Sequence, residues 1–135
     1  MAQFTTTLED NLRTVTVWEE TGEKVVTDAP VLFKGLGELI SPSDLVGIGL
    51  SACVLTIAGL EGQQRGYDFS QARVRVDKEL SDPPTVRVSK LHVHVTLPAT
   101  VPTAERLAIE HSLANCPMGL SLSPDIDRRL EVEWV

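Results

Sequence analysis

The stretch Ile40–Gly66, ISPSDLVGIGLSACVLTIAGLEGQQRG, decides the fold of this 135-residue chain. Ser41 is a good N-cap residue, and Pro42 suits the first position of a helix. Gly66 suits the residue that ends a helix. The residues between them are apolar or small on every side of a helix, so the sequence predicts a long internal helix with Cys53 in its middle.

Cys53 can be interpreted as a small core residue or as a reactive thiol. It lies about three turns from the N-cap, where the helix dipole has faded and cannot by itself activate a thiol. Burial raises the pKa of a thiol, so a reactive Cys53 needs a cation or a strong hydrogen-bond donor from elsewhere in the chain. Buried free cysteines are common and usually inert, so the helix alone leaves both interpretations open.

A second cysteine, Cys116, lies in the stretch ANCPM near the end of the chain. Pro117 disfavours a helical conformation at Cys116, so we expect a helix end and an accessible thiol there. Two such cysteines can form a reversible disulfide if the fold brings their Cα atoms within about 7 Å. A sulfenic acid on one cysteine would then be resolved by the thiol of the other.

Short strands and one further helix make up the rest of the chain. We predict strands at Phe4–Leu8, Leu12–Glu19 and Glu23–Thr27, a loop over Asp28–Pro42, strands within Tyr67–Leu80 and Thr85–Leu97, a helix over Ala104–Asn115 capped by Thr103, and a last strand over Leu130–Val135. This order is typical of an α+β fold rather than of a regular βαβ alternation. The length predicts one domain, residues 1–135.

Composition excludes several classes of partner. The net charge is −7 without a cluster of lysines and arginines, so we expect no nucleic-acid partner and no attraction to an anionic membrane. The N-terminus lacks the basic and apolar regions of a signal peptide. The weakly polar run Leu45–Leu60 has 16 residues, fewer than the ~20 that a membrane span needs. We therefore expect a soluble, cytoplasmic protein whose cysteines are free or redox-active.

Several polar residues have both a functional and a structural interpretation. His92 and His94 share one face of a predicted strand, a spacing that metal ligands use, but no third ligand is recognisable. The exposed face of an alternating strand is the interpretation that we favour. His111 could serve as a proton donor near Cys116, although an exposed histidine is the simpler interpretation. The pair Arg128–Arg129, which precedes the last predicted strand, is most simply solvated charge.

Two motifs together resemble one known family. The frame SPSDLVGIGLSAC from Ser41 to Cys53, followed by ANCPM from Ala114 to Met118, is similar to the OsmC/Ohr family of osmotically inducible protein C and organic hydroperoxide resistance proteins. The resemblance implies an OsmC-like α+β fold with N-terminal strands, a long central cysteine-bearing helix, further strands and a second helix. It also implies an intertwined homodimer with its active sites at the subunit interface.

The resemblance also implies an activity, the thiol-dependent reduction of hydroperoxides, organic ones above all. By motif position, Cys53 matches the peroxidatic cysteine and Cys116 the resolving one. The family's activating arginine comes from the N-terminal region, where Arg13 is the sole candidate before Arg65. A dithiol reductant would restore both thiols, and no metal or organic cofactor is required.

One departure from the family pattern keeps other functions open. Ser43 stands where the better-characterised peroxidases of the family carry a glutamate that orients the arginine. Asp44 follows, about 100° further round a helix. The chain is in this respect closer to the OsmC-like branch than to Ohr proper. The alternatives are a weakly or non-catalytic protein that binds a small lipophilic ligand at the dimer interface, and a cysteine hydrolase or transferase with His111 as its base.

Overall fold

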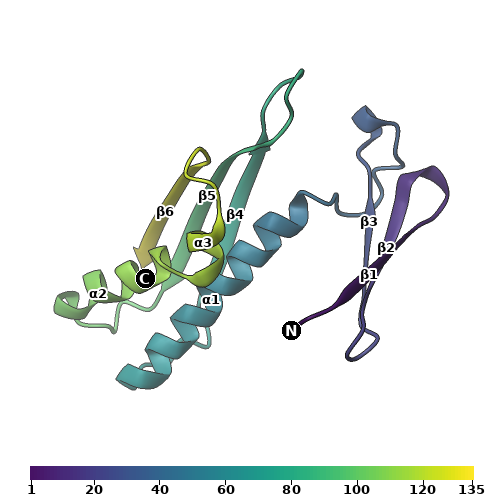
Figure 1. The fold of residues 1–135 in the computed structure, drawn as a ribbon. Coiled ribbons are helices and arrows are strands. Elements are labelled where there is room, and N and C mark those ends of the chain that lie inside the picture. Colours follow the sequence, from purple (N-terminus) through teal and green to yellow (C-terminus); the bar gives the residue numbers. More distant parts are fainter. The chain divides into compact units, whose positions relative to one another are not determined.

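The computed structural model describes residues 1–135 and divides into two compact units, Met1–Val46 and Gly47–Val135, each of which is described by itself (Figure 1). The N-terminal unit is an antiparallel sheet in the order β1 (Phe4–Leu8), β2 (Arg13–Trp18) and β3 (Lys24–Asp28). These strands follow the prediction closely. Two short 3₁₀ helices, Asp10–Leu12 and Val31–Phe33, lie in the connections.

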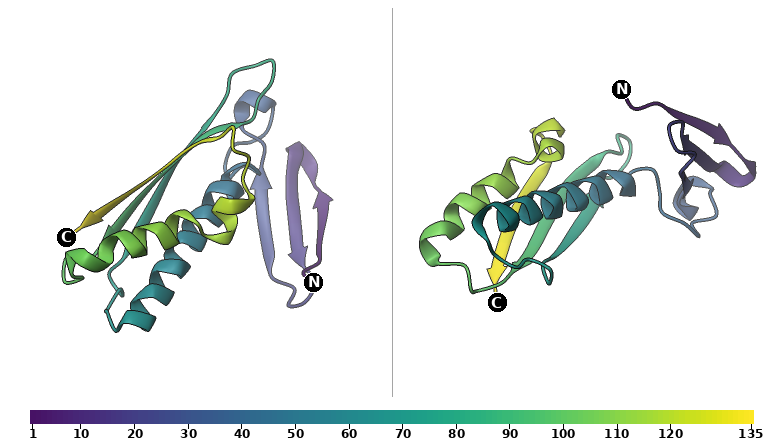
Figure 2. Two further views of the ribbon diagram at one scale, coloured as in Figure 1. Left: turned by 60° about the vertical axis from the view of Figure 1, so that its left-hand side comes forward. Right: turned by 90° about the horizontal axis from the view of Figure 1, so that it is seen from below.

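The C-terminal unit packs three helices on a second sheet. Its elements are α1 (Asp44–Arg65), which begins at the boundary of the units, β4 (Arg73–Leu80), β5 (Val88–Leu97), α2 (Thr103–Ala114), α3 (Pro117–Ser121) and β6 (Asp127–Trp134). The sheet order is β4-β5-β6; β4 pairs antiparallel with β5, and β6 pairs parallel with it. All three helices lie on one face of this sheet (Figures 1 and 2). The predicted α+β order is confirmed.

Three predicted boundaries differ from the structure. Helix α1 begins at Asp44 rather than at Pro42. The carboxylate of Asp44, its first residue, accepts the backbone N–H of Ser41 at 2.8 Å, as the acidic residue of a capping box does. Thr103 is the first residue of α2 rather than its cap. Strand β6 begins at Asp127, before the predicted Leu130, because its parallel register with β5 extends to that residue.

Helix α1 has two apolar faces. One face is buried on the sheet and consists of Gly47, Leu50, Val54, Ala58 and Gly62 at helical spacing. It meets the inward side chains of β5, namely Leu91, Val93, Val95 and Leu97, all of which are buried. The other face exposes large apolar residues: Leu45, Ile48, Leu55 and Leu60. The expected internal helix is therefore internal on one side only within a single chain.

The length and composition of α1 would also suit a helix that crosses a membrane. The core helix of a globular protein can have the same composition, and the buried face of α1 on the sheet is of that kind. The Cys53 side chain lies between the two faces and is half-buried. This position leaves the thiol within reach of groups that approach from α3.

Candidate active site

The fold brings the two cysteines together. Cys53 projects from the middle of α1, and Cys116 is the residue that precedes α3. Both are free thiols, and the two side chains lie close enough to interact. Two groups that are far apart in the sequence therefore form one pair of neighbouring sulfurs within the C-terminal unit.

The first turn of α3 holds both sulfurs. Cys116 is the N-cap of this helix, and its Sγ atom accepts the backbone N–H of Gly119 at 3.3 Å. The preceding N–H, that of Met118, points at the Sγ atom of Cys53 at 3.5 Å. The local sequence explains this geometry, because Pro117 suits the first helical position and a short polar side chain before it can cap the free N–H groups.

Cys116 is shielded, whereas Cys53 is more accessible. Only 1% of Cys116 is exposed, which corrects the expectation of an accessible thiol: the turn that Pro117 starts folds back over the sulfur. Burial raises the pKa of the Cys116 thiol, and the adjacent Cys53 raises it further; the Gly119 N–H and the Arg128 guanidinium act in the opposite direction. Cys53 is thus the more accessible of the two thiols.

A cavity of about 320 Å³ lies beside Cys116. Its apolar wall comes from α1, α2 and the sheet and includes Leu50, Val54, Val93, Leu113 and Leu130. Its polar groups are Glu110, Cys116 and Arg128. Glu110 is oriented by Trp134, whose Nε1 donates to the carboxylate at 2.9 Å. The cavity can take a small, mainly apolar molecule.

Arg128 is a site residue that the sequence analysis missed. Its side chain is exposed, as expected of solvated charge, but it lies in β6 on the side that faces the helices and lines the cavity. Its Nη1 atom donates to the carbonyl oxygen of Gly119 in α3. The alternation of the inward residues Leu130, Val132 and Trp134, continued backwards, would have placed Arg128 on this side.

Arg13 lies on β2 of the N-terminal unit and has well-ordered carboxylate partners there. Its Nε and Nη2 atoms donate to the two carboxylate oxygens of Asp28 at 2.7 and 2.8 Å, and Nη2 contacts Glu38 at 3.4 Å. The buried Asp28 also accepts the N–H groups of Glu38 and Leu39 at 3.2 and 3.1 Å. The Arg13 guanidinium holds the pKa of Asp28 below its usual range.

Asp28 and Glu38 therefore orient Arg13 in a chain that carries Ser43 at the family's glutamate position. The hydroxyl oxygen of Ser43 lies 3.2 Å from that of Ser41, within hydrogen-bond distance. The Asp44 carboxylate accepts the Ser41 backbone N–H at the start of α1. The loss of the glutamate does not leave the arginine without an orienting carboxylate.

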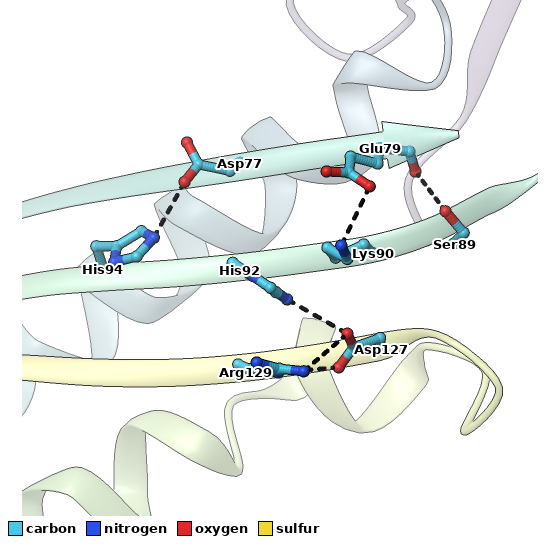
Figure 3. A network of polar contacts seen from close by, with 8 residues as sticks. All are labelled: Asp77, Glu79, Ser89, Lys90, His92, His94, Asp127 and Arg129. Atoms are coloured by element: carbon cyan, nitrogen blue, oxygen red, sulfur yellow. Dashed lines mark hydrogen bonds and ion pairs between the residues drawn. The ribbon is translucent and has the colours of Figure 1, made fainter. Parts of the chain in front are cut away.

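His92 and His94 lie on the open face of the second sheet, as the alternation of β5 predicts (Figure 3). His92 pairs with Asp127 at 3.4 Å, whereas His94 pairs with Asp77 at 3.0 Å. The two histidines thus have different carboxylate partners, and no group of three possible ligands comes together to hold a metal ion. His111 is exposed on α2.

Comparisons with known proteins agree with this architecture. The sequence model of the OsmC-like protein family matches residues 35–131. A crystal structure from Psychrobacter arcticus 273-4, of a candidate osmotic stress induced and detoxification response protein, is similar with a TM-score of 0.89 and 28% identity over 98% of this chain and 96% of that one. The search of curated proteins found no match.

More distant structures share the fold. One is an organic hydroperoxide resistance protein OsmC from Legionella pneumophila, with a TM-score of 0.78 and 14% identity over 98% of this chain and 96% of that one. Another, from Vibrio cholerae, is a candidate organic hydroperoxide resistance protein with captopril in one of its active sites; its TM-score is 0.74, with 16% identity over 96% of this chain and 90% of that one. The predicted OsmC-like fold is confirmed.

The geometry of the α3 turn makes a prediction about Gly119. A Cβ atom at this position would lie 2.8 Å from Arg128 Nη1 and 3.3 Å from Cys116 Sγ. We expect Gly119→Ala to displace the turn and to slow disulfide formation by the oxidant diamide, measured by mass spectrometry. Gly47→Ala is the matched control, because its Cβ would make an ordinary contact of 3.8 Å with Val76. Equal rates in the two variants would contradict this geometry.

Proposed function

This chain belongs to the OsmC-like protein family, and we propose that it is a thiol-dependent peroxidase that reduces organic hydroperoxides. The observation that carries the proposal is the pairing of Cys53 with Cys116 under the first turn of α3. An inert core cysteine needs no second thiol beside it. A peroxidatic cysteine, by contrast, can use a neighbouring thiol to close a disulfide.

The first step would take place at Cys53, the more accessible thiol. Its thiolate attacks the distal oxygen of the hydroperoxide, the O–O bond breaks, and the alcohol leaves after it takes up a proton. Cys53 becomes a sulfenic acid. The Met118 N–H points at this sulfur from 3.5 Å.

The second step would take place between the two cysteines. The thiolate of Cys116 attacks the sulfur of the sulfenic acid, the S–O bond breaks, and water leaves. The disulfide Cys53–Cys116 forms. A dithiol would then reduce it through a mixed disulfide and become a disulfide itself. Free thiols of this kind suit a reducing compartment, and we propose the cytoplasm.

We assign Arg13 as the activating arginine on the basis of the family resemblance. Its guanidinium is held by the bidentate contact with Asp28 and by Glu38, so it presents a fixed orientation rather than a mobile surface charge. A fixed guanidinium can stabilise a thiolate and hold a peroxide oxygen. The two carboxylates around Arg13 support this role in spite of Ser43.

A second copy of the chain is the partner that we propose for the exposed face of α1. Leu45, Ile48, Leu55 and Leu60 form an apolar stripe at helical spacing, and their exposed fractions are 36–47%. A stripe of large apolar side chains on a long helix is typical of a surface that another subunit covers. A homodimer in which these stripes meet would bury them.

The cavity beside Cys116 favours a second candidate function, the binding of a small lipophilic ligand without turnover. Its apolar wall and its volume of about 320 Å³ suit such a ligand. The remaining rival, a hydrolase with His111 as base, has no support from the exposed position of that residue.

Intact mass after a single turnover separates the two candidates. We expect the reduced chain to lose two hydrogens after one equivalent of cumene hydroperoxide, faster than with hydrogen peroxide. Cys116→Ser should stop at the sulfenic acid, and Cys53→Ser should not react. Both thiols intact after long exposure of the unsubstituted chain would contradict the peroxidase and leave ligand binding.

The dimer is tested by light scattering of the purified chain. We expect the mass of two chains, and we expect Leu55→Glu to weaken the association because it places a charge in the apolar stripe. Leu107→Glu is the control, since Leu107 is 77% exposed on α2. A monomeric unsubstituted chain would exclude the homodimer.

A further inference from the structure

Arg128 connects the second sheet to the turn that holds the thiols. It is the second residue of β6, its side chain reaches the cavity beside Cys116, and its Nη1 atom donates to the Gly119 carbonyl oxygen. The same Gly119 donates its N–H to Cys116 Sγ. One side chain therefore stabilises the residue that contacts the buried sulfur.

The contact between Arg128 and Gly119 affects the hydrogen-bond donors of both cysteines. Met118 and Gly119 are consecutive, and their N–H groups point at Cys53 Sγ and Cys116 Sγ at 3.5 and 3.3 Å. A shift of Gly119 would move both donors at once. Helix α3 has only five residues, too few to be stable without tertiary contacts, and Arg128 supplies such a contact from the sheet.

Arg128 also places a positive charge near Cys116, where few other groups can carry charge. The groups around Cys116 that can carry charge are Cys53 on α1, Glu110 on α2 and Arg128 on β6. Glu110 accepts a hydrogen bond from Trp134. Arg129, the next residue of β6, turns to the open face and pairs with Asp127 at 3.3 Å (Figure 3). Within the C-terminal unit, Arg128 is therefore the cation that acts on the buried thiol.

We propose that Arg128 is a positioning residue for the resolving step: it fixes the first turn of α3 and provides the positive charge that faces Cys116. This inference rests on the proposed peroxidase function. In that step the Cys116 thiol loses its proton, its sulfur bonds to the sulfenic sulfur of Cys53, and the hydroxide released from the S–O bond takes up the proton as water. The Cys116 sulfur is oxidised and the Cys53 sulfur is reduced.

The physical reason is that a thiolate, not a thiol, attacks sulfur. Burial opposes formation of the Cys116 thiolate and raises its pKa; the Gly119 N–H and, to a smaller extent, the Arg128 guanidinium oppose this effect. A positive charge acts more strongly on a buried group than on one surrounded by water. Without Arg128 the sulfenic acid on Cys53 would still form but would persist longer.

The first test follows the sulfenic acid in a single turnover by rapid quenching and mass spectrometry. Arg128→Gln keeps a donor for the Gly119 carbonyl and removes the charge, whereas Arg128→Lys keeps the charge. We expect Arg128→Gln to slow disulfide formation about tenfold near neutral pH, the size that fits loss of one charged partner, with the first step unchanged. Arg128→Lys should recover most of the rate, and Arg129→Gln should match the unsubstituted chain.

The second test does not depend on peroxide chemistry. In a Cys53→Ser background, Cys116 is titrated by the ultraviolet absorbance of its thiolate, with the Cys53→Ser/Cys116→Ser chain as the baseline. We expect Arg128→Gln to move the midpoint to higher pH and Arg129→Gln to leave it in place. Circular dichroism verifies that each variant is folded, and Arg128→Lys provides the folded comparison if Arg128→Gln is not.

The outcomes separate this inference from the proposed function. If the unsubstituted chain leaves peroxides intact, the peroxidase proposal fails, and a titration shift confined to Arg128→Gln still supports the effect of Arg128 on Cys116. Equal midpoints in Arg128→Gln and Arg129→Gln would overturn the inference even if the chain reduces peroxides. Equal sulfenic acid lifetimes in the two variants would overturn it as well.

Discussion

Two consecutive backbone N–H groups, those of Met118 and Gly119, point at the sulfurs of Cys53 and Cys116, and the rest of the site depends on this contact. This contact converts two separate cysteines into a thiol pair. It requires a helix start at Pro117, a half-buried position for Cys53 on α1, and a side chain that stabilises the turn from the sheet. Arg128 on the parallel strand β6 is that side chain, because its Nη1 atom donates to the carbonyl oxygen of Gly119. The chemistry proposed for the chain follows from this turn rather than from either cysteine alone.

The two faces of α1 explain how a half-buried thiol can lie in so apolar a helix. Leu50, Val54 and Ala58 attach the helix to the sheet and are almost fully buried. The opposite stripe is exposed in a single chain, which is the physical basis for proposing a second copy. Cys53 lies at the border of the two faces, so its side chain is neither fully buried nor fully exposed to solvent. That border is where a substrate could approach a held sulfur.

The fold could be predicted from the sequence because its signals are local and redundant. Capping residues and glycine bracket α1, and alternation marks β4 and β5. The cysteine pair was indicated by motif resemblance, although spacing alone could not show that the thiols meet. The burial of Cys116 was missed because Pro117 starts a new turn over the sulfur instead of ending the structure. Arg128 was missed because the parallel pairing that extends β6 to Asp127 is a tertiary contact.

The fold holds Cys53 and Cys116 in an arrangement that is ready to close a disulfide. The most direct test of this claim is the thiol–disulfide equilibrium of the chain with reduced and oxidised glutathione, measured by mass spectrometry with and without denaturant. If the α3 turn holds the sulfurs together, the folded chain should form the Cys53–Cys116 disulfide at a much lower proportion of oxidised glutathione than the unfolded chain does. The same equilibrium in both states would contradict the claim and would leave Cys53 as a residue of the core.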